Sequence, residues 1–164
     1  MEIRQRVRDV VLEEGSALVK VSRVPDRPGI AARLFGAIAA AGIGVDMILQ
    51  NASVQRTTDM AFTVKREDVA KVRQVLTPVL KEIGAGGLDV RDDVVKAEVV
   101  GTGILSDPSY VGHLFRALGS EHVNVLAIGT SEIRISCLID KADRTKARKA
   151  LNAAFQVTAA PERA

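Results

Sequence analysis

Aromatic residues are scarce in this chain of 164 residues, since Phe, Tyr and Trp make up 3% of it and Trp is absent. A hydrophobic core must therefore be built from Ala, Val, Ile and Leu. Few aromatic residues are available to stack on nucleic-acid bases, which argues against a nucleic-acid-binding domain. The single cysteine, Cys137, excludes a disulfide scaffold and a thiolate metal site.

Long apolar runs are absent as well. No stretch of about 20 apolar residues is present, so we expect no transmembrane helix and no membrane partner. The first 14 residues are charged throughout, unlike a signal peptide, and we expect a cytoplasmic protein. The net charge is +3, but Lys and Arg alternate with Asp and Glu, which is typical of a solvated surface and gives no nucleic-acid patch.

The chain contains an internal repeat. Residues 24–50 resemble residues 104–130 at an offset of 80, with identical residues at several positions. The matching pairs are Pro28 and Pro108, Leu34 and Leu114, Phe35 and Phe115, Ala37 and Ala117, Val45 and Val125, and Ile48 and Ile128. Each copy of about 75 residues would bury only about 60% of its extended-chain surface. The copies must therefore pack on each other or on a second chain.

The hydrophobic pattern of the first copy predicts a βαββαβ order. Asp26 and Pro28 signal a helix start, and Gly42 signals its end. The expected strands are 16–24, 45–50, 58–64 and 88–90, and the expected helices are 30–41 and 67–83.

The second copy repeats this order but ends early. Its expected strands are 95–101, 123–128 and 133–139, its expected helices are 108–119 and 141–155, and at most a short strand follows residue 156. A strand-like segment precedes the first copy, and we expect residues 5–13 to complete the second sheet. The prediction is therefore α+β, with two tandem ferredoxin-like domains at 15–92 and 94–158.

Residues for catalysis are not assembled anywhere in the sequence. There is no phosphate-binding loop of the Walker type, and Gly101-Thr102-Gly103 lacks the third glycine of a dinucleotide fingerprint. His113 and His122 have no acidic or Cys partner at metal-ligand spacing. Cys137 lies in an apolar strand, as a small buried residue does. We therefore expect no catalytic residue, no metal site and no cofactor.

The start of the first helix is the best candidate for a binding site. The N–H groups of Gly29, Ile30 and Ala31 would point out of the helix toward a carboxylate, and the helix dipole would favour it. Asp26 would pair with an ammonium group. A right-handed crossover places Gln50 beside Asp26, so the group suits a zwitterionic amino acid. The alternative is that Asp26 only caps its helix and Gln50 only ends a strand.

Three segments carry a family resemblance. VPDRPGIAARLFGAIAAAGIGVDMILQN, TTDMAFTV and TSEIRISCLID resemble the regulatory half of aspartate kinases, which consists of tandem ACT domains. The similarity runs in order over roughly residues 15–155, and the family's catalytic half is absent. The chain therefore resembles the small regulatory β subunit or an excised regulatory fragment.

The resemblance implies a regulatory protein that is not an enzyme by itself. It would bind a feedback effector, threonine, lysine or both, and allosterically inhibit aspartate kinase in the synthesis of lysine, threonine and methionine. We expect threonine in preference to lysine, because its short side chain matches a site between a helix start and a strand end. The implied partners are a second copy, in a homodimer, and the catalytic α subunit. The alternative is a stand-alone amino-acid-sensing ACT protein that regulates a different enzyme or regulator.

The resemblance also implies where the effector binds, between the first module of one copy and the second module of the other. The first-module contacts would be Asp26, Gly29, Ile30, Ala31 and Gln50, and the second-module contacts would be Asn124, Val125 and Ser131. The second helix start departs from the family pattern. Ser109 and Tyr110 stand where relatives have Gly and Val, so the sequence does not decide whether a ligand binds there.

Overall fold

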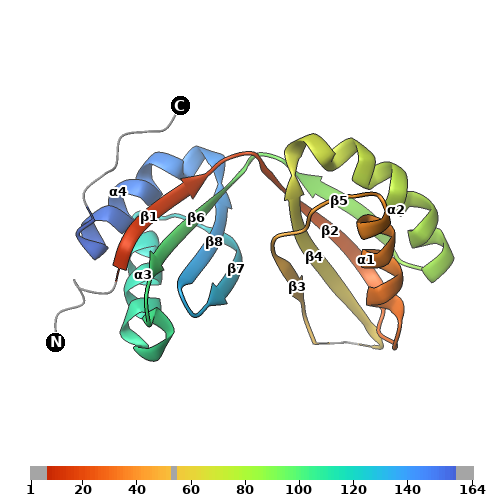
Figure 1. The fold of residues 1–164 in the computed structure, drawn as a ribbon, viewed down its shortest axis with the longest axis horizontal. Helices are drawn as coiled ribbons and strands as arrows, with labels where there is room; N and C mark the ends of the chain where they lie inside the picture. The colour runs from red at the N-terminus through yellow and green to blue at the C-terminus, as the bar shows by residue number, and fades with distance from the viewer. Residues whose placement is uncertain (1–6, 53–54, 158–164) are drawn as a thin grey trace. The chain divides into compact units, whose positions relative to one another are not determined.

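A computed structural model describes residues 7–52 and 55–157, and the chain divides into two compact units (Figure 1). The first unit is Gly15–Asp92, and the second combines Met1–Glu14 with Asp93–Ala164. In its described residues, each unit has one four-stranded antiparallel sheet and two α-helices. Residues 5–6 of the expected N-terminal strand and residue 158 of the expected second domain lie outside the described residues.

The first unit follows the βαββαβ order, and its sheet has the strand order β3-β4-β2-β5. Strand β4 is antiparallel to both β2 and β3, so β2 and β3 are parallel and end at the same edge. Its elements are β2 (Ser16–Pro25), α1 (Ile30–Ala40), β3 (Ile48–Gln50), β4 (Thr57–Lys65), α2 (Val69–Ile83) and β5 (Gly87–Arg91).

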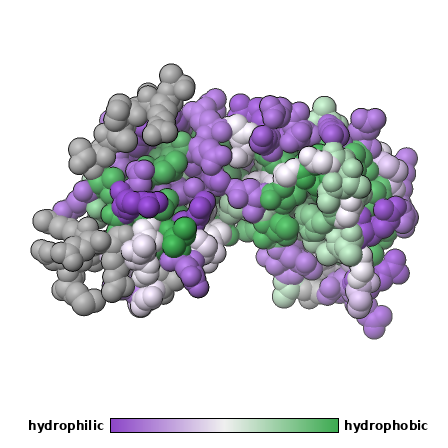
Figure 2. Space-filling view, in the orientation of Figure 1, coloured by the Kyte–Doolittle hydropathy of each residue, from purple (hydrophilic) through white to green (hydrophobic). Residues whose placement is uncertain are grey.

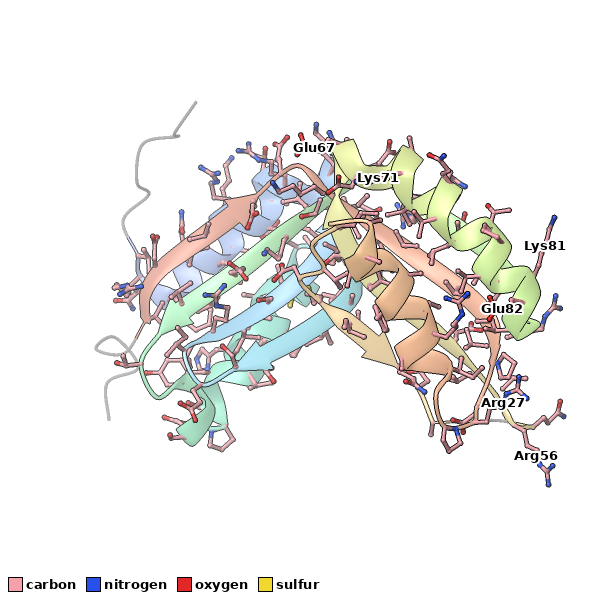
Figure 3. The ribbon with its side chains drawn as sticks, turned by 45° about the vertical axis from the view of Figure 1, so that its right-hand side comes forward. Arg27, Arg56, Glu67, Lys71, Lys81 and Glu82 are labelled. Carbon is pink, nitrogen blue, oxygen red and sulfur yellow. The ribbon has the colours of Figure 1, made fainter. Side chains whose placement is uncertain are left out.

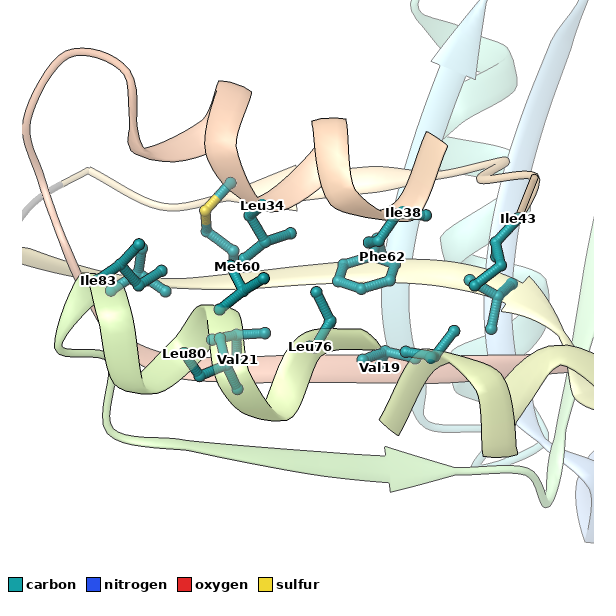
Figure 4. Close-up of a cluster of buried hydrophobic side chains, with 14 of the residues drawn as sticks. Val19, Val21, Leu34, Ile38, Ile43, Met60, Phe62, Leu76, Leu80 and Ile83 are labelled. Atoms are coloured by element: carbon teal, nitrogen blue, oxygen red, sulfur yellow. The ribbon is translucent and has the colours of Figure 1, made fainter. Parts of the chain in front are cut away.

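The core of the first unit lies between its sheet and its two helices (Figure 4). Apolar residues three or four apart on α1 and α2 form one stripe on each helix, and alternate residues of the strands face them. Phe62 of β4 is fully buried and makes an edge-to-face contact with Phe35 at a centroid distance of 5.4 Å. Outside the core, Arg33 of α1 and Glu82 of α2 form an exposed ion pair.

The second unit repeats this architecture, but one of its edge strands comes from the segment that precedes the first unit. Its elements are β1 (Val7–Glu13), β6 (Val94–Gly101), α3 (Ser109–Ser120), β7 (Val125–Ser131), β8 (Arg134–Asp140) and α4 (Arg144–Phe155). The strand order is β1-β6-β8-β7, so β1 takes the place that β5 has in the first unit. Glu13 pairs with Lys96, and the chain between them forms the first unit.

The face of the second sheet opposite its helices carries a buried polar network. Lys96 and Glu98 are 5% and 6% exposed and alternate along β6 with the apolar core residues. Glu98 accepts a hydrogen bond of 2.7 Å from the Ser136 hydroxyl and lies 3.5 Å from the Arg134 guanidinium. The Lys96 ammonium lies 3.1 Å from Glu13. The network thus joins β1, β6 and β8.

One strand is shorter than its sequence predicts. The hydrophobic pattern predicts a strand over 45–50, but β3 covers only Ile48–Gln50. The Thr63 hydroxyl accepts the Met47 N–H at 2.9 Å, and the Thr63 N–H donates to the Met47 carbonyl. A side chain therefore replaces one rung of the backbone ladder before β3 begins.

The fold class is confirmed as α+β and ferredoxin-like, with two similar units and antiparallel sheets. None of the helices in the described residues is long and apolar enough to cross a membrane. On the face shown in Figure 2, hydrophobic residues gather over α1 and the adjoining strands of the first unit, and polar residues cover most of the rest.

Candidate functional site

The loop between β2 and α1 ends at Gly29, whose backbone has a conformation that residues with a side chain rarely adopt. Gly29 is the N-cap of α1 and has φ 92°, in the left-handed region. A Cβ atom added there would have no atom within 4 Å, so the space that a side chain of this residue would occupy is open. The first-turn N–H groups of a helix carry partial positive charge. An anion can therefore approach the backbone at Gly29.

The structure corrects two details predicted for this helix start. Asp26 does not cap α1, because Gly29 is the N-cap and α1 has no side-chain cap hydrogen bond. Ile30 does not present a free N–H group, since it donates to the Arg27 carbonyl at 3.4 Å, and its side chain is buried in the core. Among the described residues, the N–H groups of Gly29 and Ala31 have no hydrogen-bond partner.

The ends of β2 and β3 meet at the same edge of the sheet, with β4 between them. The Asp26 N–H donates to the Arg56 carbonyl at 2.9 Å, which fixes the backbone of Asp26 against the start of β4. The buried Thr58 hydroxyl donates to the Asn51 carbonyl at 2.8 Å. Gln50 is exposed on the far side of β4. Asp26, Gly29 and Gln50 thus lie toward the same edge of the sheet, but Gln50 pairs with Met60 whereas Pro25 pairs with Thr57, so β4 separates Gln50 from Asp26.

Sequence reasoning missed the residues that β4 contributes to this edge. Thr58 belongs to the TTDMAFTV segment, and the hydroxyl groups of its threonines were the signal that could have pointed to this edge. Arg27 and Arg56 lie at the same end of the unit and point away from the core (Figure 3). Both side chains are exposed, so two positive charges lie at the end of the unit that holds the helix start. Asp26, which is exposed and has no ion-pair partner among the described residues, supplies the negative charge.

The residues predicted in the second unit do not form one group. Asn124 is exposed just before β7, and Val125 is the first residue of that strand. Ser131 is the last residue of β7. A strand rises about 3.3 Å per residue, so Ser131 lies about 20 Å from Val125. A single amino acid cannot contact both ends of this strand in one copy.

The side chains considered for catalysis are in structural roles. Cys137 is fully buried in the core of the second unit, and burial raises the pKa of its thiol to about 12, so it stays protonated at neutral pH. His113 contacts the Ser109 carbonyl through Nδ1 at 3.1 Å. Within the described residues, no three His, Cys, Asp or Glu side chains are placed to hold a metal ion.

The conformation of Gly29 gives a direct test of the helix start. We expect Gly29→Ala to reduce the free energy of unfolding by about 1–2 kcal/mol, because an L-residue is strained at positive φ. Gly36→Ala, inside α1 and also facing open space, is the matched control. It should increase stability by about 0.5–1 kcal/mol. Urea unfolding of both variants measures the difference, and equal effects would contradict the assigned role of Gly29.

Comparison with known proteins identifies the class to which this fold and helix start belong. A model of the ACT domain family matches residues 21–79 and 98–155, one stretch in each unit. The chain belongs to the ACT domain family. It is 38% identical to an aspartokinase of Thermus thermophilus over 159 residues, which cover 96% of this chain and 39% of that protein. The chain thus spans about two fifths of the length of this curated relative.

Two solved structures are similar over nearly the whole chain. The ligand-free regulatory subunit of aspartate kinase from Thermus thermophilus has a TM-score of 0.88 and 38% identity, and the match covers 92% of this chain and 99% of that one. A structure of aspartokinase alpha and beta subunits contains a chain with a TM-score of 0.86, 38% identity and the same two coverages. The matched region is regulatory in the first of these, so the chain is not itself the catalytic part.

Proposed function

We propose that this chain is the regulatory part of an aspartate kinase and that it binds a feedback amino acid, threonine in preference to lysine. The observation that carries the proposal is the match over 99% of a regulatory subunit, combined with the open helix start at Gly29. Two ACT units, Gly15–Asp92 and Met1–Glu14 with Asp93–Ala164, would form the binding module. The chain would act in the cytoplasm.

The helix start offers complementary groups for an amino acid. The ligand carboxylate would accept hydrogen bonds from the N–H groups of Gly29 and Ala31, which need no side chain to reach it. The ammonium would pair with the Asp26 carboxylate. The backbone of Asp26 is held near the helix start by the hydrogen bond from its N–H to the Arg56 carbonyl. Gln50 would contact the ligand from the end of β3.

Charge favours threonine over lysine at this site. Arg27 and Arg56 place two positive charges around the helix start. They attract the carboxylate that both amino acids share, but they repel the second ammonium of lysine. The short, uncharged side chain of threonine meets no such repulsion. We propose that Asn124 and Val125 of a second copy complete the site, whereas Ser131, at the other end of β7, contacts a different part of that interface.

The edge strands of the two sheets support a homodimer. Ile48 on β3 and Ile128 on β7 occupy matching positions in the repeat and are 56% and 46% exposed. Both strands are at an edge, where unpaired backbone groups and an apolar side chain are available to another chain. We propose that β3 of one copy pairs with β7 of the other. This pairing brings the first unit of one copy to the second unit of its partner.

The proposed interface predicts that the wild-type chain is a dimer and that the substitution Ile48→Asp dissociates it. A buried interface residue of this kind is worth about 2 kcal/mol, and a two-fold assembly contains it twice. The dissociation constant should therefore rise about a thousandfold. Light scattering after size exclusion measures the mass, and Val11→Asp, at the exposed β1 edge, is the control that leaves the dimer intact. A monomeric wild-type protein at micromolar concentrations would contradict the proposal.

Inhibition would require that the effector bind one state of the assembly better than another. The decisive experiment is calorimetric titration of the chain with threonine and with lysine, followed by assays of the reconstituted kinase with its catalytic subunit. Threonine should bind, and it should lower kinase activity only when this chain is present. If neither amino acid binds, the proposed function is wrong.

A further inference from the structure

We propose that Asp107 closes the helix start of the second unit, so that each copy binds one effector, at the first unit alone. The inference rests on the proposed function, because it concerns the same kind of ligand. The two helix starts occupy matching places in the repeat, with Pro28 and Pro108 at the same position. A repeat of this kind predicts two equivalent sites, and the side chains make them different.

The first difference is a carboxylate that the second helix start already holds. The Asp107 side chain accepts a hydrogen bond from the Ser109 N–H at 2.9 Å. Ser109 is the residue that matches Gly29, so this N–H is the one that an amino-acid carboxylate would take. The residue that matches Asp107 in the first unit is Arg27, which carries the opposite charge. An internal anion thus occupies one helix start, and an internal cation flanks the other.

The second difference is packing. Gly29 precedes its helix in the left-handed conformation and faces open space, whereas Ser109 is already the first residue of α3 and carries a side chain. Tyr110, which matches Ile30, is 1% exposed and stacks on Phe155 at a centroid distance of 6.3 Å. Ile104 in the preceding loop is fully buried in the same core. The loop and helix start of the second unit are therefore packed together.

These differences decide which helix start a free amino acid can occupy. A tethered carboxylate competes at an effective concentration of the order of millimolar or more. It also repels the incoming carboxylate, because like charges would share one set of N–H donors. At the first unit, Arg27 attracts the ligand, and no side chain of residues 7–52 or 55–157 takes the N–H group of Gly29. Residue 27 and its counterpart at 107 therefore determine how many effectors bind.

The test is calorimetric stoichiometry with threonine on the full chain. Wild type should bind one threonine per chain. A triple variant should bind two: Asp107→Ala and Ser109→Gly free the helix start, and Ser106→Asp supplies the counterpart of Asp26. The reciprocal variant, Arg27→Asp, places the closing carboxylate at the first helix start and should weaken binding at least tenfold. Circular dichroism and the melting curve check that each variant is folded. One threonine per chain in the triple variant would overturn the role of Asp107.

The remaining outcomes separate this inference from the proposed function. Two threonines per wild-type chain would overturn the closure but leave the regulatory function intact. If threonine and lysine do not bind at all, the proposed function fails. Whether Asp107 holds the Ser109 N–H is then measured by amide hydrogen exchange in the ligand-free protein. The Ser109 amide should then exchange more slowly in wild type than in Asp107→Ala. Equal exchange rates would overturn the closure.

Discussion

Threonine at about 100 times its dissociation constant should raise the melting temperature of the chain by about 5–10 °C. A ligand that binds only the folded state at this concentration adds about 2.7 kcal/mol per site. For a chain of this size, 1 kcal/mol corresponds to about 2–4 °C in melting temperature. Differential scanning fluorimetry measures the shift, and lysine serves as the comparison ligand. An unchanged melt with both amino acids would refute the proposed site.

Asp26→Ala should remove most of this shift, because the ligand ammonium would then be desolvated without its counter-charge. The melt without ligand should change by no more than about 0.5 kcal/mol, since Asp26 is exposed and does not cap α1. Asp89→Ala, at an exposed position on β5, is the matched control and should respond to threonine as wild type does. An equal response of Asp26→Ala would place the site elsewhere.

Glu98→Ala should destabilise the protein by about 3–5 kcal/mol, because it removes one member of a buried ionic network. The Lys96 ammonium would lose a carboxylate 3.8 Å away in a place where only 7% of its side chain is exposed. The Ser136 hydroxyl would lose its acceptor as well. Urea unfolding monitored by circular dichroism measures the change. A loss below about 1 kcal/mol would show that the network is solvated.

The first unit supplies a matched control for that experiment. Lys20 on β2 forms an ion pair with Asp59 on the neighbouring strand β4. This pair corresponds to Glu98 on β6 and Arg134 on β8, with the positive and negative charges exchanged between the strands. Their side chains are 51% and 40% exposed, and the hydrogen bond from Lys20 lowers the pKa of Asp59. An exposed pair contributes about 0–1 kcal/mol. Lys20→Ala should therefore have a small effect, which isolates burial as the cause of the larger one.

Much of the fold could be predicted because its signals are local or repeated. The helical spacing of Leu34 and Ile38, and the alternation along β2 and β8, indicate the elements directly. A count of strands also shows that the second copy lacks one and that residues 7–13 are spare. The start of β3 could not be predicted, because it depends on the Thr63 hydroxyl, which meets Met47 only in the folded chain.

The candidate site could be predicted only where chain topology determines it. A right-handed crossover brings Asp26 and Gln50 to one edge of the sheet, whatever the side chains are. The contributions of Arg56 and Thr58 depend on β4, because its place between β2 and β3 brings both residues to this edge. The family motif predicts Ser131 by position alone, whereas the length of β7 separates it from Val125. The cap at Gly29 was missed because Asp26 has the more familiar capping side chain.

Strand β1 has a consequence for how the chain folds during synthesis. The first unit is made of one continuous stretch, Gly15–Asp92, and can form as soon as that stretch is available. The second unit must wait, because β1 is synthesised first but pairs with β6, which follows the whole first unit. Closing that long loop is slow for an unfolded chain. A first unit that is already folded holds Gly15 and Asp92 together, so it acts as a template that brings β1 back to its partner.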